Sequence, residues 1–176
     1  MEVHGSNLDG FELCRTFSNG RQKHNYASCM KQQRTENLKI GADLIPIKKM
    51  VTMGQIRMYA DASGDYNPIH IDEEFGKNSQ FGRNIGHGMM AAATISELMA
   101  ESFGTAWYNT GKMKMRFRSP VYPGDEIQTS GQVKKLEDTT NSSHITCSVV
   151  IISQDGDVII SGETSVTVDK SAPDDA

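Results

Sequence analysis

Asp65-Tyr66-Asn67-Pro68-Ile69-His70 is the stretch from which the fold and function of this 176-residue chain are best predicted. It places a carboxylate and an imidazole five residues apart, with a proline between them that forbids a continuous helix. The residue before a proline is biased toward extended geometry, so Asn67 is expected to turn the chain after a helix that runs through Tyr59. Asp65 and His70 are therefore predicted to converge across that bend.

A carboxylate and a histidine that face each other are the groups that acid–base chemistry on water requires. One group takes a proton from the attacking oxygen, and the other orients or returns it. Histidine titrates near neutral pH, and a nearby carboxylate can fix its orientation. The alternative is a turn in which Asp65 or Asn67 caps backbone amides, with His70 an ordinary half-buried ring.

A second motif, Gly86-His87-Gly88, opens an apolar run that is closed by Gly104. This pattern predicts one buried helix of about sixteen residues, roughly 24 Å long. The N-terminus of such a helix carries unpaired N–H groups and partial positive charge. At Gly88 such an N–H can bind the carbonyl oxygen of a thioester and stabilise the enolate formed when water adds two carbons away. The alternative is a tight entry turn without a ligand.

Three segments resemble a known enzyme family. YADASGDYNPIHID at 59–72 and FGRNIGHGM at 81–89 look like the hydratase-2 signature of MaoC-like, (R)-specific enoyl-CoA hydratases. RFRSPVYPGD at 116–125 is similar to the strand and turn that follow the central helix in that family. The resemblance covers roughly residues 44–168. One departure is Asn84, where many relatives have proline, and it brings into question the stiffness of the loop before the helix but not the chemistry.

The resemblance implies an α+β hot-dog fold, in which an antiparallel sheet wraps around a long central helix. It also implies the reversible hydration of trans-2-enoyl-CoA, or another enoyl thioester, to the (R)-3-hydroxyacyl thioester. Carried over to this sequence, Asp65 and His70 would hold and activate the catalytic water, and the Gly88 amide would be the oxyanion donor. The supporting residues of the motif would be Ser63, Asn67 and His87.

Three rivals to this function stay open. A hot-dog acyl-thioesterase would direct water at the carbonyl carbon instead. A metal site would use His70, Asp72 and His87, but their spacing matches no standard ligand pattern, so no metal is predicted. A non-catalytic acyl-thioester binding subunit is the third, and the intact pair of Asp65 and His70 argues against it. No cofactor is expected, because coenzyme A is part of the substrate.

Composition limits the partners of the chain. The net charge of −4 and the pI near 5.7 argue against nucleic acid, since binding phosphate backbones usually needs a basic domain. No apolar run approaches the ~18 residues of a membrane span. The expected partners are an acyl-CoA or acyl-carrier thioester and further copies of the chain, which would form a homodimer or a dimer of dimers and shield sheet edges.

Cysteine usage indicates a reducing compartment. Cys14, Cys29 and Cys147 are an odd, sparse set without C-x-x-C spacing, so neither a disulfide framework nor a zinc site is indicated. Reduced thiols are typical of an intracellular protein. The cytoplasm is the expected location, with an organelle matrix as the alternative if the N-terminal residues form a targeting segment.

Three parts are predicted along the chain. Residues 1–43 are polar and are expected to form a flexible N-terminal extension, residues 44–170 the hot-dog domain, and residues 171–176 a frayed C-terminus. The extension has other interpretations: a transit peptide, upstream sequence before a true start at Met30, or an arm that covers CoA phosphates or a partner subunit. The acidic residues Glu2, Asp9 and Glu12 oppose the transit peptide.

Pattern and turn residues predict the elements of the domain. A strand is expected at 44–53, broken near Pro46, with helices at 55–63 and 72–77 before the central helix. A loop carrying Trp107 and Tyr108 should follow, then four strands at 112–118, 126–136, 144–153 and 158–168. The strand at 112–118 alternates strictly, with Met113, Met115 and Phe117 expected over the core and basic residues on the other face. Those cations are either solvated or meet CoA phosphates.

Overall fold

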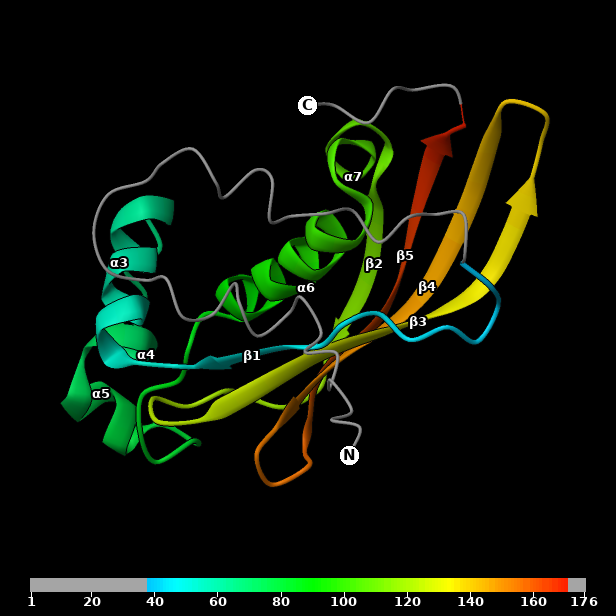
Figure 1. The fold of residues 1–176 in the computed structure, drawn as a ribbon. Helices are drawn as coiled ribbons and strands as arrows, with labels where there is room; N and C mark the ends of the chain where they lie inside the picture. The colour runs from blue at the N-terminus through cyan, green and yellow to red at the C-terminus, as the bar shows by residue number, and fades with distance from the viewer. Residues whose placement is uncertain (1–37, 171–176) are drawn as a thin grey trace, which may run out of the picture. The chain divides into compact units, whose positions relative to one another are not determined.

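A five-stranded antiparallel sheet and one long helix dominate the computed structural model, which describes residues 38–170 (Figure 1). The predicted C-terminus and nearly all of the predicted N-terminal extension lie outside the described residues, so the division into three parts stays a prediction. The strand order is β1-β3-β4-β5-β2. The strands are β1 (Ile47–Met50), β2 (Lys112–Phe117), β3 (Glu126–Asp138), β4 (Ser142–Ser153) and β5 (Val158–Asp169). The helices are α3 (Met53–Ser63), α4 (Pro68–Ile71), α5 (Glu73–Asn78), α6 (Gly88–Phe103) and α7 (Thr105–Thr110).

Strands β3, β4 and β5 are long neighbours joined by hairpins, and the short strands β1 and β2 form the two edges. The predicted interruption at Pro46 is present. Before it, Asp43 bridges to Gln132 of β3 and the Leu44 N–H donates to the Gly131 carbonyl at 2.8 Å. Pairing then resumes at Ile47, because proline has no N–H to give to the ladder.

The long helix α6 has the predicted position and length. It contacts β3, β4 and β5, and in Figure 1 it lies across one face of the sheet. The helix is apolar around most of its circumference, and most of its apolar side chains are buried, although Met89 in the first turn is 54% exposed. The fully covered members include Ala91, Ala92, Ile95, Leu98, Met99 and Phe103. The hot-dog arrangement predicted from the sequence is therefore confirmed.

The segment after α6 was predicted to be a loop, and this prediction is wrong. Gly104, at φ 53°, ends α6 and leads directly into the short helix α7. Trp107 is buried, and its indole Nε1–H donates to the Ser96 hydroxyl of α6 at 2.9 Å. A Cβ on Gly111 would lie 2.4 Å from the Trp107 ring, so only glycine fits beneath it. Tertiary packing therefore imposes a helix where local propensity is weak.

One member of the predicted apolar face of β2 is also placed differently. Met113 and Met115 pack against the core, but Phe117 is 53% exposed. Phe117 ends β2 beside Gly88, the first residue of α6, so no further turn of that helix covers its ring. The alternation predicted for this strand is therefore correct at Met113 and Met115. The ring of Phe117 is exposed because α6 begins beside it and does not cover it.

Within the described residues, we find no helix with the length and apolar character needed to cross a bilayer.

Candidate active site

The turn between α3 and α4 determines where Asp65 lies. A capping box between Thr52 and Gln55 begins α3, and Gly64 ends it in the left-handed region at φ 75°. Helix α4 begins at Pro68, four residues later, with Asn67 as its N-cap. The Asn67 Oδ1 accepts the Ile69 N–H at 3.1 Å. Asp65 therefore lies in the short connection, outside both helices.

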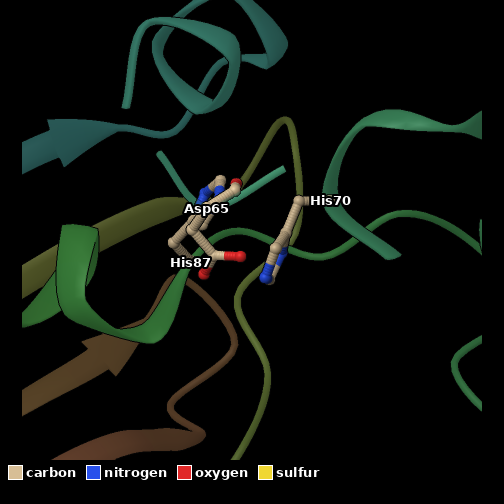
Figure 2. A group of neighbouring side chains, drawn as sticks. All are labelled: Asp65, His70 and His87. Carbon is tan, nitrogen blue, oxygen red and sulfur yellow. The ribbon is translucent and has the colours of Figure 1, made fainter. Parts of the chain in front are cut away.

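Asp65 and His70 converge across this bend, together with His87. One ligand atom from each of the three side chains lies within 4.8 Å of the others. In Figure 2 the Asp65 carboxylate points toward the His70 ring. No direct hydrogen bond between these two side chains occurs among residues 38–170. A water with two hydrogen bonds of about 2.8 Å each fits a gap of this size.

The orientation of the His70 ring decides which nitrogen can act as a base. His70 is 9% exposed, and its Nδ1 lies 2.9 Å from the Ile85 carbonyl oxygen. A carbonyl can only accept, so Nδ1 carries the proton in this bond. In the neutral ring Nε2 then holds the lone pair, and it has no protein partner in the described part of the chain. His70 is thus held as an acceptor for a proton from water.

The N-terminus of α6 supplies the electrostatic part of the site. No side chain caps this helix, and the Gly88 N–H has no acceptor among the residues that the structure describes. Free N–H groups and the helix dipole make such an end suited to a developing oxyanion. The loop that leads into α6 is held by the Gly86 N–H, which donates to the Val121 carbonyl at 2.7 Å. A Cβ on Gly88 would lie 2.9 Å from the Phe117 ring, so glycine permits this close approach.

An open cleft of about 300 Å³ joins the carboxylate to this helix end. Ser63, which lines this cleft, links the end of α3 to Asp65. Its hydroxyl donates to the Tyr59 carbonyl at 2.7 Å and accepts the Asp65 N–H at 3.2 Å. His70 does not line this cleft in the single chain. The lining residues are Tyr59, Ser63, Asp65, His87, Gly88, Met89 and Phe117.

The three clustered side chains fit a metal ion poorly. The His70 and His87 rings stack with centroids 3.8 Å apart and planes inclined by 27°. Lone pairs in nearly parallel rings cannot both aim at one ion about 2.1 Å away. Asp72, the other acidic ligand considered from the sequence, caps α5 by accepting the Phe75 N–H at 3.0 Å. The absence of a metal remains a prediction that this geometry supports.

Asn84, the position where the sequence departs from the family pattern, is anchored in the loop before α6. The side chain is buried, and its Nδ2 donates to the Ile69 carbonyl at 3.0 Å and to the Asp72 carbonyl at 2.7 Å. These bonds tie the loop to α4 and to the start of α5. Nothing in the sequence pattern distinguishes this asparagine from an exposed loop residue, so its role needed the structure.

Comparison with known proteins identifies relatives of the chain. A family model described as "MaoC like domain" matches residues 36–154. A 3-hydroxybutyryl-CoA dehydratase from Methylorubrum extorquens is 31% identical over 140 residues, covering 77% of this chain and 83% of the relative. A mitochondrial 3-hydroxyacyl-[acyl-carrier-protein] dehydratase from Arabidopsis thaliana is 31% identical over 129 residues, covering 73% and 76%. A solved (R)-hydratase from A. caviae involved in PHA biosynthesis matches with a TM-score of 0.65 and 26% identity, covering 74% and 97%.

The fold, the site and these relatives define a class: the chain is an enzyme of the hydro-lyase class with a hot-dog fold. It belongs to the MaoC-like dehydratase domain family, as the motifs within residues 59–90 predicted.

Proposed function

We propose that this enzyme reversibly hydrates trans-2-enoyl thioesters to (R)-3-hydroxyacyl thioesters. One observation carries the proposal. The Asp65 carboxylate and the His70 imidazole lie within 4.8 Å of each other, beside a helix N-terminus whose Gly88 N–H has no acceptor in the described residues. The (R) configuration rests on the family resemblance and on the (R)-hydratase among the solved relatives.

The catalytic cycle begins with a water between the two side chains. Asp65 accepts a hydrogen bond from the hydrogen that stays on the oxygen, and the His70 Nε2 takes the other proton as the oxygen attacks C3. The electrons of the C2–C3 double bond move toward the thioester carbonyl, and the Gly88 N–H stabilises the enolate oxygen. The His70 imidazolium then returns its proton to C2. The net change is the addition of one water, and dehydration follows the same steps in reverse.

The substrate carrier is coenzyme A or an acyl carrier protein, and no separate cofactor takes part. The named relatives support this proposal, because one acts on a CoA thioester and the other on a carrier-protein thioester. The mitochondrial relative supports an organelle matrix as the alternative to the cytoplasm.

We further propose a homodimer, with a dimer of dimers as the larger assembly. Among the residues that the structure describes, the edge strand β2 pairs on one side only, with β5. Phe117 and Met89 expose 53% and 54% of their surface beside the cleft. A second copy would shield this edge and apolar surface, and it would add walls to a cleft that is open in the single chain.

The test is hydration of crotonyl-CoA, followed by the ultraviolet absorbance of the conjugated double bond and by chiral analysis of the product. Asp65→Asn and His70→Gln should each lower kcat by roughly 10²-fold or more, the scale of one acid–base group. Matched controls are Asp155→Asn, an exposed turn residue, and His144→Gln, on β4; both should retain activity. Circular dichroism checks that each variant is folded.

Two outcomes would replace the proposal. Release of free coenzyme A, detected with a thiol reagent and without a change in the conjugated double bond, would identify a thioesterase. Tight binding of enoyl-CoA without turnover would identify a non-catalytic binding subunit.

A further inference from the structure

His87 contacts both members of the proposed dyad, the main chain of Asp65 and the ring of His70. It is 2% exposed and immediately precedes Gly88, so its main chain leads directly into the proposed oxyanion donor. Figure 2 shows its ring grouped with Asp65 and His70. A ring in this place connects three parts of the site that are separate in sequence.

The first contact fixes the main chain of Asp65. The His87 Nε2 lies 3.0 Å from the Asp65 carbonyl oxygen. Since a carbonyl can only accept, Nε2 carries the proton and donates it. This bond fixes the main chain of the short connection that holds the carboxylate, 22 residues earlier in the chain.

The second contact fixes the plane of His70. The two imidazole rings stack at 3.8 Å with an angle of 27°, and the Tyr59 ring approaches His87 at 4.9 Å and 49°. The hydrogen bond from the His70 Nδ1 to the Ile85 carbonyl does not by itself fix the plane of the ring, because the ring can tilt about a single bond. The face of His87 restricts that tilt, and so directs the His70 Nε2 lone pair.

The remaining nitrogen of His87 is consistent with a role beyond packing. Its Nδ1 is buried and has no hydrogen-bond partner in the described part of the chain. Unpaired buried polar atoms are rare in folded proteins, and they concentrate at functional sites. A phenylalanine would fill a similar volume without leaving such an atom, but it would lack the donor to Asp65.

We propose that His87 is a positioning residue, which aligns the Asp65 backbone and the His70 ring with the Gly88 amide. This inference rests on the proposed function. Misplacing catalytic groups by about 1 Å can cost on the order of 10²-fold in rate, so the ring need not touch the substrate to control kcat.

Two variants separate the two contacts. His87→Phe keeps an aromatic face against His70 but loses the donor, and His87→Gln keeps a donor but loses the ring. Each should lower kcat for crotonyl-CoA by about 10-fold to 10²-fold, with KM within about 2-fold, because substrate binding groups are unchanged. Urea unfolding confirms that the measured protein is folded, and His144→Gln serves as the histidine control.

A combination with His70→Gln gives the decisive reading. If the His87 ring acts through His70, adding His87→Gln, which removes that ring, to His70→Gln should cost little further activity. Wild-type kcat in both His87 variants, or losses that multiply fully in the double variant, would overturn the inference. Retained activity in His70→Gln and Asp65→Asn themselves would instead overturn the proposed function, so the two failures are distinguishable.

Discussion

Asn84 illustrates how one side chain outside the cleft fixes the position of residues inside it. Its two hydrogen bonds hold the carbonyls of Ile69 and Asp72, which flank the end of α4. Ile69 is the neighbour of His70, so the bond fixes the backbone from which the imidazole projects. A Cβ on Gly76 would lie 2.6 Å from the Asn84 main-chain nitrogen, which shows how closely the loop packs on α5.

Asn84→Ala should therefore destabilise the protein. Truncation removes two hydrogen bonds of about 0.5–1.5 kcal/mol each, while the Ile69 and Asp72 carbonyls keep the Ile85 and Gly76 N–H groups as donors. Urea unfolding should show this loss as a lower midpoint with an unchanged slope. Asn109→Ala, an exposed asparagine on α7, is the matched control. Equal midpoints for the two variants would show that the Asn84 bonds do not stabilise the fold.

Among the secondary-structure elements, α6 allows a direct test, because the Gly88 N–H at its N-terminus can be deleted while the helix is kept. Proline is tolerated at the first helical position, where the N–H has no partner within the helix. His87, at φ −63° and ψ 130°, has the extended geometry that a residue before proline prefers. Gly88→Pro therefore deletes the proposed oxyanion donor within an intact helix start.

Gly88→Pro should lower kcat by roughly 10²-fold to 10³-fold, the loss expected for one oxyanion donor. Gly88→Ala is the control, because it keeps the N–H while placing a Cβ 2.9 Å from the Phe117 ring. The exposed ring can move aside, so alanine should lose much less. Equal losses in steady-state assays of the two variants would assign the effect to crowding and would contradict the oxyanion role.

The sequence predicted the elements that have strong periodicity and clear end signals. Glycines bracket α6, and alternation marks the strands, so their positions agree closely with the structure. Helix α7 was missed because it depends on Trp107 packing and on a bond to Ser96, which are long-range effects. The bend at Pro68 predicted that Asp65 and His70 converge. The stacked His87 ring and the Asn84 anchor could not be predicted, because each depends on the spatial neighbours of a loop.

For the whole molecule, the edge of β2 that no strand within residues 38–170 pairs predicts self-association. Sedimentation velocity at micromolar concentration should give a species of twice the 19.4 kDa chain mass, or a higher multiple of it. Phe117→Glu should weaken that assembly by placing charge on the exposed apolar surface, whereas Tyr108→Glu, on the exposed part of α7, should not. A monomer in the wild-type protein would contradict the proposed homodimer.

The central claim is that Asp65 and His70 act on one shared water, and a double-mutant cycle tests it most directly. We expect Asp65→Asn and His70→Gln each to lower kcat for crotonyl-CoA hydration by roughly 10²-fold or more, and the double variant to be little worse than the poorer single variant. Full multiplication of the two losses, or near-normal kcat in either single variant, would contradict it.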